Sequence, residues 1–216
     1  KVMGLSAYTK EKYVKEAYDV LFKDKIRVVE KENGYVIECD FDTTTTEQYL
    51  KENAYGIRFD NVAGAVQYVT ETIVTEWIEK NIKKFDIHDI AVSGGVFMNV
   101  KLNKIIQESN LVNSVKFLPS CGDESNVIGA LYYYSKNIAK MNTIPLEEMY
   151  MGISYSNDDI NKYVENNEIK AKYKIEYFED INQKVAELLS QRNIVARATG
   201  KNEWGARSLG NRAILG

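Results

Sequence analysis

The residues 200–212 carry charged side chains at a spacing that suits phosphate chemistry. Lys201, Arg207 and Arg212 alternate with glycines, and Glu203 stands between them. An arginine guanidinium recognises phosphate or carboxylate through two parallel hydrogen bonds, and a carboxylate at the position of Glu203 can orient such an arginine. The alternative is a solvated basic turn, which the three glycines in this stretch make less favourable.

A second candidate site is the turn Ser93-Gly94-Gly95, which follows a short apolar run. Glycines let backbone N–H groups approach a phosphate or ribose closely, and the amino end of a following helix favours an anion. Asn99 lies one helical turn further on, and two interpretations are open: its side chain contacts a nucleotide, or it is exposed to solvent. The glycine pair alone is a weak signal, because many α/β proteins use one for packing.

Asp123 follows Gly122 at the start of a helical segment. One interpretation is a helix N-cap with no further role. The other is a ligand for a hard cation or its water, at the same sheet edge as the Gly94-Gly95 turn. His88 and Cys121 are given no role, since a nucleophilic cysteine needs a base nearby and the chain has one histidine.

Composition excludes several classes of protein. The chain has 216 residues, 44% hydrophobic and 27% charged, which is ordinary for a folded globular protein. Its net charge of −3 argues against a dedicated nucleic-acid binder. Two cysteines cannot form a disulfide framework, so we expect a cytoplasmic protein. No apolar run is long enough for a transmembrane helix, so we expect no membrane partner.

The elements that must position these residues follow from local patterns. Two strands, 26–30 and 35–39, flank the turn signal Asn33-Gly34. A helix is expected over 47–53. A longer helix over 60–83 has apolar residues every three to four positions, with Asp60 or Asn61 as its cap.

The segment after this long helix alternates between strand and helix patterns. Strands are expected at 89–93 and 115–118, with helices at 96–109 and 123–138. This order predicts an α/β domain with neighbouring parallel strands, whose carboxyl ends carry the ligand-binding loops.

Residues 139–157 have the composition of a linker. Beyond them we expect helices at 158–166 and 181–191, and strands at 174–178 and 193–198. These expectations are read from the spacing of apolar and turn-forming residues.

Five segments, in the right order, resemble motifs of the nodulation-protein-type O-carbamoyltransferases. The family motifs are KVMGLAPYG, AGGVALN, GDaGaAlGAA, yLGpsYs and EfGpRALGNRSIL. The matching segments are Lys1–Tyr8, Ser93–Asn99, Asp123–Ala130, Tyr150–Ser156 and Glu203–Leu215. The Gly-Gly motif is shared with the wider actin-like ATPases, whereas the last motif is much more specific.

The resemblance implies an α/β fold in two parts. Residues 1–140 would be the second half of an actin-like ASKHA (ribonuclease H-like) domain. Residues 141–157 would be a linker, and 158–216 the start of a YrdC-like α/β domain. On this interpretation the chain is a central piece of a longer enzyme.

The resemblance also implies the reaction. The YrdC-like part would make carbamoyl-adenylate from carbamoyl phosphate and ATP, and the ATPase-like part would pass the carbamoyl group to a hydroxyl of a sugar or natural product. Gly94, Gly95, Asn99 and Lys201 would bind the nucleotide. Catalysis would fall to Arg207, Arg212 and Glu203.

A divalent metal would assist, iron by resemblance or magnesium with ATP, and Asp123 would be one of its ligands. In the family the paired histidine ligands lie upstream of the KVMGLAPYG segment. The sequence departs from the family at several positions: Lys201, where arginine is common, Ala206, Ser208, Ala213, Glu124 and Ser125. The arginines themselves are kept.

Two alternatives stay open. One is a hydrogenase-maturation-type carbamoyltransferase, whose SGGVFQN segment is close to Ser93–Asn99. The other is a non-catalytic ASKHA module that binds nucleotide or another protein. The acceptor and the oligomeric state cannot be read from the sequence.

Overall fold

The computed structural model describes residues 2–118, 120–166 and 168–216. The chain forms two compact units, Lys1–Cys121 and Gly122–Gly216. The described residues combine helices with small sheets, so the mixed α/β class is confirmed. The ASKHA and YrdC-like assignments and the domain limits 1–140, 141–157 and 158–216 stay predictions.

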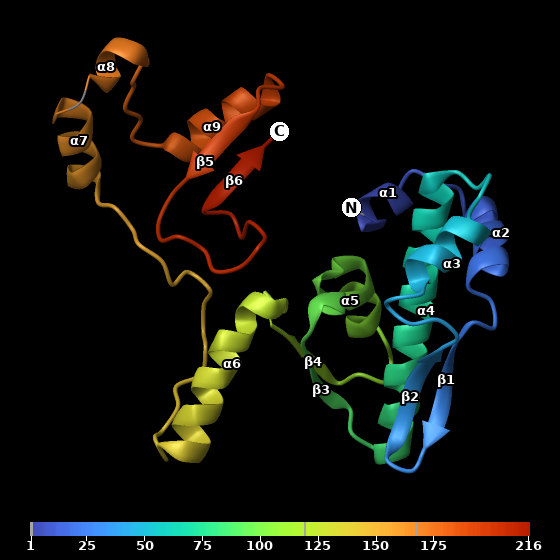
Figure 1. Cartoon of the computed structure of the whole chain (residues 1–216). Helices are drawn as coiled ribbons and strands as arrows, with labels where there is room; N and C mark the ends of the chain where they lie inside the picture. The colour runs from blue at the N-terminus through green and yellow to red at the C-terminus, as the bar shows by residue number, and fades with distance from the viewer. Residues whose placement is uncertain (1, 119, 167) are drawn as a thin grey trace. The chain divides into compact units, whose positions relative to one another are not determined.

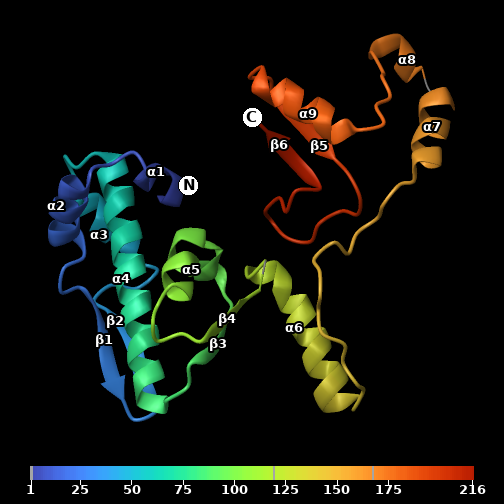
Figure 2. The same ribbon diagram turned by 180° about the vertical axis from the view of Figure 1, so that it is seen from behind.

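The first unit is built around one long helix, α4 (Phe59–Phe85). It lies between the β1–β2 hairpin and α5, as the two opposite views show (Figures 1 and 2). Its N-terminal half packs on α1 (Val2–Ser6) and α2 (Glu11–Leu21), and α3 (Thr46–Asn53) packs on α2. The helices expected at 60–83 and 47–53 are therefore confirmed.

Two apolar clusters lie along α4. The first joins α2 to α4 and contains Ala17, Leu21, Phe22, Ala65, Val69 and Ile73. The second joins the C-terminal half of α4 to α5 and contains Ile78, Ile82, Leu102 and Ile106. A single helix therefore contributes to the core at both ends of the unit.

The start of α4 differs from the expectation. Its N-cap is Arg58, which is extended and makes no side-chain capping bond. Asp60 instead accepts two hydrogen bonds from the Arg58 guanidinium, at 3.1 and 3.0 Å. Asn61 accepts one from the Thr9 hydroxyl at 2.5 Å. The predicted cap by Asp60 or Asn61 is wrong, because both side chains have partners beside the helix start.

The hairpin of β1 (Ile26–Lys31) and β2 (Gly34–Cys39) is confirmed and antiparallel. Its register pairs Lys31 with Gly34, so the turn is Glu32-Asn33 and not the expected Asn33-Gly34. Gly34 has φ +126°, and a Cβ there would lie 2.7 Å from the Asn81 Oδ1 atom on α4. The Trp77 indole donates a hydrogen bond of 2.7 Å to the Tyr35 carbonyl. The tight approach at Gly34 thus lets the hairpin dock on α4.

The parallel pair expected from the alternating pattern is present. β3 (Asp89–Val92) pairs with β4 (Ser114–Phe117) in parallel register. The segment between them is divided: residues Gly95–Met98 form a 3-10 turn, and α5 spans Val100–Gln107. The expected continuous helix over 96–109 is therefore interrupted at Asn99, which is extended.

The second unit begins with a 3-10 turn (Asp123–Ser125), α6 (Asn126–Tyr133) and a π turn (Tyr134–Ile138). α7 (Asn157–Asn166) and α8 (Ile169–Lys172) follow. α9 (Ile181–Ser190) packs on β5 (Val195–Ala198), as Figure 1 shows. Residues 174–178 form no strand, so that prediction is wrong; β5 pairs instead with β6 (Arg212–Leu215), which the sequence pattern did not predict.

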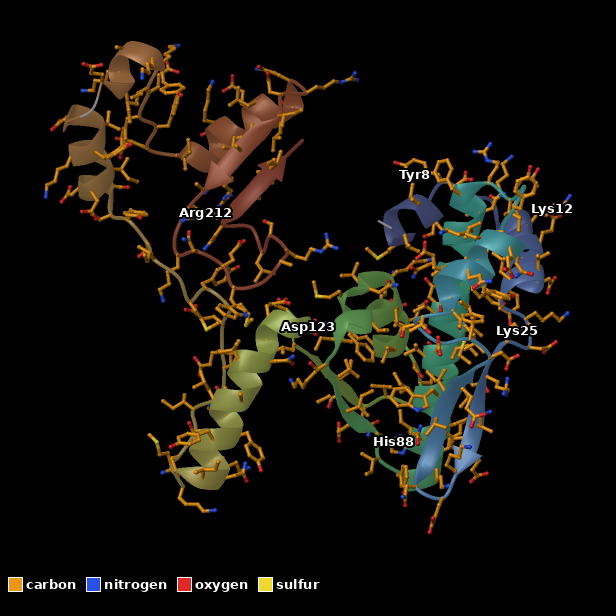
Figure 3. The ribbon with its side chains drawn as sticks, in the orientation of Figure 1. Tyr8, Lys12, Lys25, His88, Asp123 and Arg212 are labelled. Carbon is orange, nitrogen blue, oxygen red and sulfur yellow. The ribbon has the colours of Figure 1, made fainter. Side chains whose placement is uncertain are left out.

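His88 joins the end of α4 to the region before β4 (Figure 3). Its Nδ1 atom lies 2.8 Å from the Leu111 carbonyl oxygen and its Nε2 atom 3.1 Å from an Asp86 carboxylate oxygen. The Leu111 carbonyl, followed by Asp86, raises the pKa of His88 above its ordinary value, because both favour the protonated ring.

Asp86→Asn is expected to lower the pKa of His88 toward its ordinary value, since it removes the negative partner. Asparagine also tolerates the left-handed backbone of residue 86, at φ 53°. A raised pKa stabilises the fold below the ordinary value, and this stability is lost as pH rises through the raised value. Because the chain has one histidine, proton NMR shows a single histidine C2 resonance, and its pH titration gives the pKa of His88 directly. A wild-type pKa at or below that of histidine in the unfolded chain would contradict the prediction.

No helix in the described part of the chain is long and apolar enough to cross a membrane.

Candidate functional site

The Gly94-Gly95 turn lies directly after β3. Gly94 has φ +104°, a backbone conformation that other residues rarely adopt, so glycine is required there. A Cβ built at Gly94 or at Gly95 meets no atom within 4 Å. Since packing does not require a second glycine, the open space over Gly95 is available to a ligand.

Asn99 is held firmly within the first unit. Its Oδ1 atom accepts a hydrogen bond from the Leu102 backbone N–H at 3.2 Å and so caps α5. Its amide also pairs reciprocally with Gln67, at 2.8 and 3.1 Å. Asn99 therefore fixes the Gly94-Gly95 turn against α4, and its predicted contact with adenylate stays a prediction.

The sequence reasoning missed the polar residues behind Asn99. Gln67, on α4, is 3% exposed and donates a second hydrogen bond of 2.6 Å to Glu71. Glu71 forms an ion pair of 3.1 Å with Lys101 on α5. One signal in the sequence could have indicated this pair: Gln67 lies among the apolar positions of a long helix. A buried amide needs a hydrogen-bond partner, so a polar residue from another element was to be expected beside it.

Gln67→Leu is expected to lower the free energy of unfolding by about 1–2 kcal/mol, because it leaves the amide of Asn99 without its partner. Urea unfolding measures the loss. Gln48→Leu on α3 is the matched control: Gln48 is exposed, and its side chain donates to Glu52, four residues away on the same helix. If the two variants lose the same stability, the Gln67–Asn99 pair is not a significant link.

Asp123 begins the 3-10 turn before α6 and is exposed (Figure 3). Within residues 2–118, 120–166 and 168–216, no three side chains of His, Cys, Asp or Glu are grouped so that they could hold a metal ion. Asp123 therefore does not belong to a complete metal site made by the described residues alone. Its predicted role as a ligand stays a prediction.

The loop 199–211 of the second unit joins β5 to β6. Its residues line a hollow of about 440 Å³ that is open to solvent. Glu203, Arg207 and Arg212 all line this hollow. The three residues assigned to catalysis therefore lie together. Lys201 is turned toward Glu148, at 3.1 Å, and does not line the hollow.

Glu203 and Arg212 hold the loop in shape. The Arg212 guanidinium donates hydrogen bonds to the carbonyl oxygens of Thr199, Gly200 and Asn211, at 2.5, 3.2 and 3.0 Å. The carboxylate of Glu203 accepts one from the Asn211 backbone N–H. Burial acts to raise the pKa of Glu203, but backbone donors and the Arg212 charge outweigh it, so the pKa is lowered and the carboxylate is ionised at neutral pH.

Arg207 differs from Arg212. Its side chain is exposed, and no residue that the structure describes makes a hydrogen bond or an ion pair with it. All its donors are therefore available to a ligand in the hollow. Of the two arginines, Arg207 is placed to bind an anion, and Arg212 to shape the loop that presents it.

Residues 1–132 match the family model described as the carbamoyltransferase N-terminus. The chain belongs to this carbamoyltransferase family. The match contains Gly94, Gly95, Asn99 and Asp123, whereas the loop 199–211 lies beyond it.

The relatives of this carbamoyltransferase chain include two nodulation proteins. It is 24% identical to nodulation protein NolO of Bradyrhizobium diazoefficiens, and 24% identical to NolNO of Sinorhizobium fredii, in both cases over the whole chain. It is 33% identical over 78% of its length to an uncharacterized protein of Methanocaldococcus jannaschii. The chain covers 39%, 32% and 28% of these proteins, respectively, so it corresponds to about a third of their length.

The nodulation-type resemblance is thereby confirmed. The alignment with the nodulation proteins extends through the loop 199–211, since it covers the whole chain. Both candidate sites therefore lie in the region shared with them.

Proposed function

We propose that this chain is part of an enzyme that transfers a carbamoyl group from carbamoyl phosphate, through carbamoyl-adenylate made with ATP, to a hydroxyl of a sugar or natural product. Membership of the carbamoyltransferase family supports the transfer. We place the reaction in the cytoplasm, where a thiol such as that of Cys39 stays reduced.

The observation that carries this proposal is the hollow of the loop 199–211. It combines an arginine with available donors, Arg207, with an ionised carboxylate and a second arginine that hold the loop. A guanidinium fork fits the phosphate groups of carbamoyl phosphate and of ATP. We therefore assign binding of the phosphate-bearing substrates to this loop.

The reaction balances when water takes part. Carbamoyl phosphate, ATP and water give carbamoyl-adenylate, phosphate and pyrophosphate. The acceptor hydroxyl then takes the carbamoyl group, AMP leaves, and the hydroxyl proton is released. Arg207 would stabilise negative charge on the phosphate groups, while Arg212 and Glu203 keep the loop in position.

The Gly94-Gly95 turn is the proposed site for the adenylate. The space beside Gly95 is open, and the Asn99–Gln67 pair fixes the turn on α4. A divalent metal, with Asp123 as one of its ligands, would supply positive charge that stabilises phosphate groups. The described residues contain no group of three such ligands, so we derive no step through the metal.

Isothermal titration of the chain with ATP tests this proposal, with and without a divalent metal. We expect binding by the wild-type chain and weaker binding by Gly95→Val, because the added side chain fills the open space over the turn. Gly129→Val on α6 is the control, since a Cβ there also meets no atom within 4 Å. Absence of binding in both conditions would contradict nucleotide binding by this chain.

A further inference from the structure

The segment 148–153 of the second unit runs alongside the loop 199–211. Figures 1 and 2 show this part of the chain, between α6 and α7, beside the loop that precedes β6. Three backbone hydrogen bonds join the segment to the loop: from Gly152 N–H to the Asn202 carbonyl at 3.0 Å, from Asn202 N–H to the Ile153 carbonyl at 3.0 Å, and from Trp204 N–H to the Met149 carbonyl at 2.8 Å. Residues 202–204 of the loop are therefore held by this segment.

Met149 anchors the segment. Its side chain is 3% exposed, and it is the one buried apolar side chain among the described residues of the second unit. Glu148 adds an ion pair of 3.1 Å with Lys201, but both side chains are more than half exposed, so this pair contributes little. The backbone hydrogen bonds and the burial of Met149 therefore carry the contact.

The other limb of the loop is held by a side chain of the same segment. The Tyr150 hydroxyl donates a hydrogen bond of 3.0 Å to the Leu209 carbonyl. Arg207 lies between the two held stretches, three residues after Trp204 and two residues before Leu209. The position of its backbone therefore depends on this segment as well as on the hydrogen bonds of Arg212.

Gly152 lies very close to the loop. A Cβ built there would be 2.5 Å from the Asn202 Cβ atom and 3.1 Å from the Asn202 carbonyl oxygen. Neither atom is the end of a flexible side chain, so neither can move aside without moving the backbone. A larger residue at position 152 would push Asn202 away, and Asn202 lines the hollow. Glycine at position 152 is thus required for the position of a lining residue.

We propose that the segment 148–153, which lies within the expected linker, is a positioning element of the loop that binds phosphate groups. Its positioning residues are Tyr150 and Gly152. Neither lines the hollow, so each acts through the loop, Gly152 through Asn202 and Tyr150 through Leu209. The ligand is a phosphate group bound by Arg207, so the inference rests on the proposed function.

Hydrogen exchange of the loop tests the contact without any ligand. Mass spectrometry follows the exchange of the backbone amides of residues 202–211 in the chain of 216 residues. Tyr150→Phe removes one hydrogen bond, and we expect exchange to become about twofold to fivefold faster. Gly152→Ala is expected to accelerate exchange about tenfold or more, because the added methyl group displaces Asn202. Circular dichroism checks that both variants stay folded.

Titration with pyrophosphate to about 10 mM, a range suited to weak binding, tests the role in binding phosphate groups. We expect the Kd of Tyr150→Phe to rise about twofold to fivefold while its thermal unfolding midpoint stays unchanged, a combination that a merely structural role would not give. Tyr155→Phe and Gly129→Ala are the matched controls. Tyr155 is 66% exposed, and a Cβ at Gly129 meets no atom within 4 Å, so neither change is expected to alter exchange or binding.

Faster exchange and weaker binding in Tyr150→Phe and Gly152→Ala, with both controls unchanged, would support the positioning role. Exchange or binding that stays the same in both variants would overturn it. If the wild-type chain binds no pyrophosphate while exchange in the variants is faster, the proposed function is contradicted, and the role in binding phosphate groups with it.

Discussion

Arg207→Ala is expected to reduce carbamoyl-phosphate-dependent pyrophosphate release by the full-length protein about a hundredfold or more. The reason is that Arg207 is the arginine of the hollow whose donors are not taken by the described residues. In a partly enclosed site, removal of one such donor to a phosphate group lowers the rate by that order. Steady-state release of pyrophosphate, measured against the concentration of carbamoyl phosphate, gives the change in kcat/KM.

The variant is expected to keep its thermal stability, since the exposed Arg207 side chain leaves no partner behind. Arg197→Ala is the matched control. Arg197 is an exposed arginine of β5 in the same unit, bonded to Asn182 at 3.5 Å and outside the lining of the hollow. Unchanged pyrophosphate release in Arg207→Ala would refute the role of Arg207, and an equal loss in both variants would point to a general effect of charge.

Leu102→Ala is expected to destabilise the first unit by about 3 kcal/mol. Leu102 is fully buried in the cluster that joins α5 to α4, and its removal leaves a cavity as well as losing apolar contact. Its backbone N–H also donates to the cap residue Asn99, which follows the 3-10 turn Gly95–Met98. Urea unfolding followed by circular dichroism measures the loss.

Val100→Ala serves as the control on the same helix. Val100 is 65% exposed, so its truncation is expected to change stability by less than about 0.5 kcal/mol. A loss of stability no larger than that of Val100→Ala would contradict the assignment of Leu102 to the core.

The elements that the sequence predicts well are those with a local physical signature. The β1–β2 hairpin follows from its two-residue turn signal, and α4 follows from apolar residues repeated along one face. The parallel pairing of β3 and β4 follows from the alternation of strand and helix. In each case the information lies within a few residues of the element itself.

The features that the sequence did not predict depend on partners far along the chain. Gln67 meets Asn99 only because α4 and α5 pack together, and no local pattern encodes that pairing. Arg212 resembles a phosphate-binding arginine by its motif, yet its donors reach backbone carbonyls of the same loop. Residues 174–178 have strand-like composition, but β5 takes β6 as its partner.

The same reasoning applies to the candidate site. The motif of residues 200–212 groups Glu203, Arg207 and Arg212, and the structure places all three in the lining of one hollow. It did not separate the arginine that is available to a ligand from the one that holds the backbone. That distinction requires the positions of the carbonyl groups, which the order of residues does not contain.

The Arg212 hydrogen bonds and the β5–β6 pairing have a consequence for the energetics of ligand binding. Together they close the loop 199–211 at its base as the second unit folds. The conformational entropy of the loop is therefore lost during folding and not when a ligand arrives. The backbone that carries Arg207 is therefore already ordered, so a phosphate-bearing ligand that binds as proposed would only have to fix the exposed Arg207 side chain. Binding at this loop should accordingly show only a small change in heat capacity, in contrast to a segment that folds around its ligand.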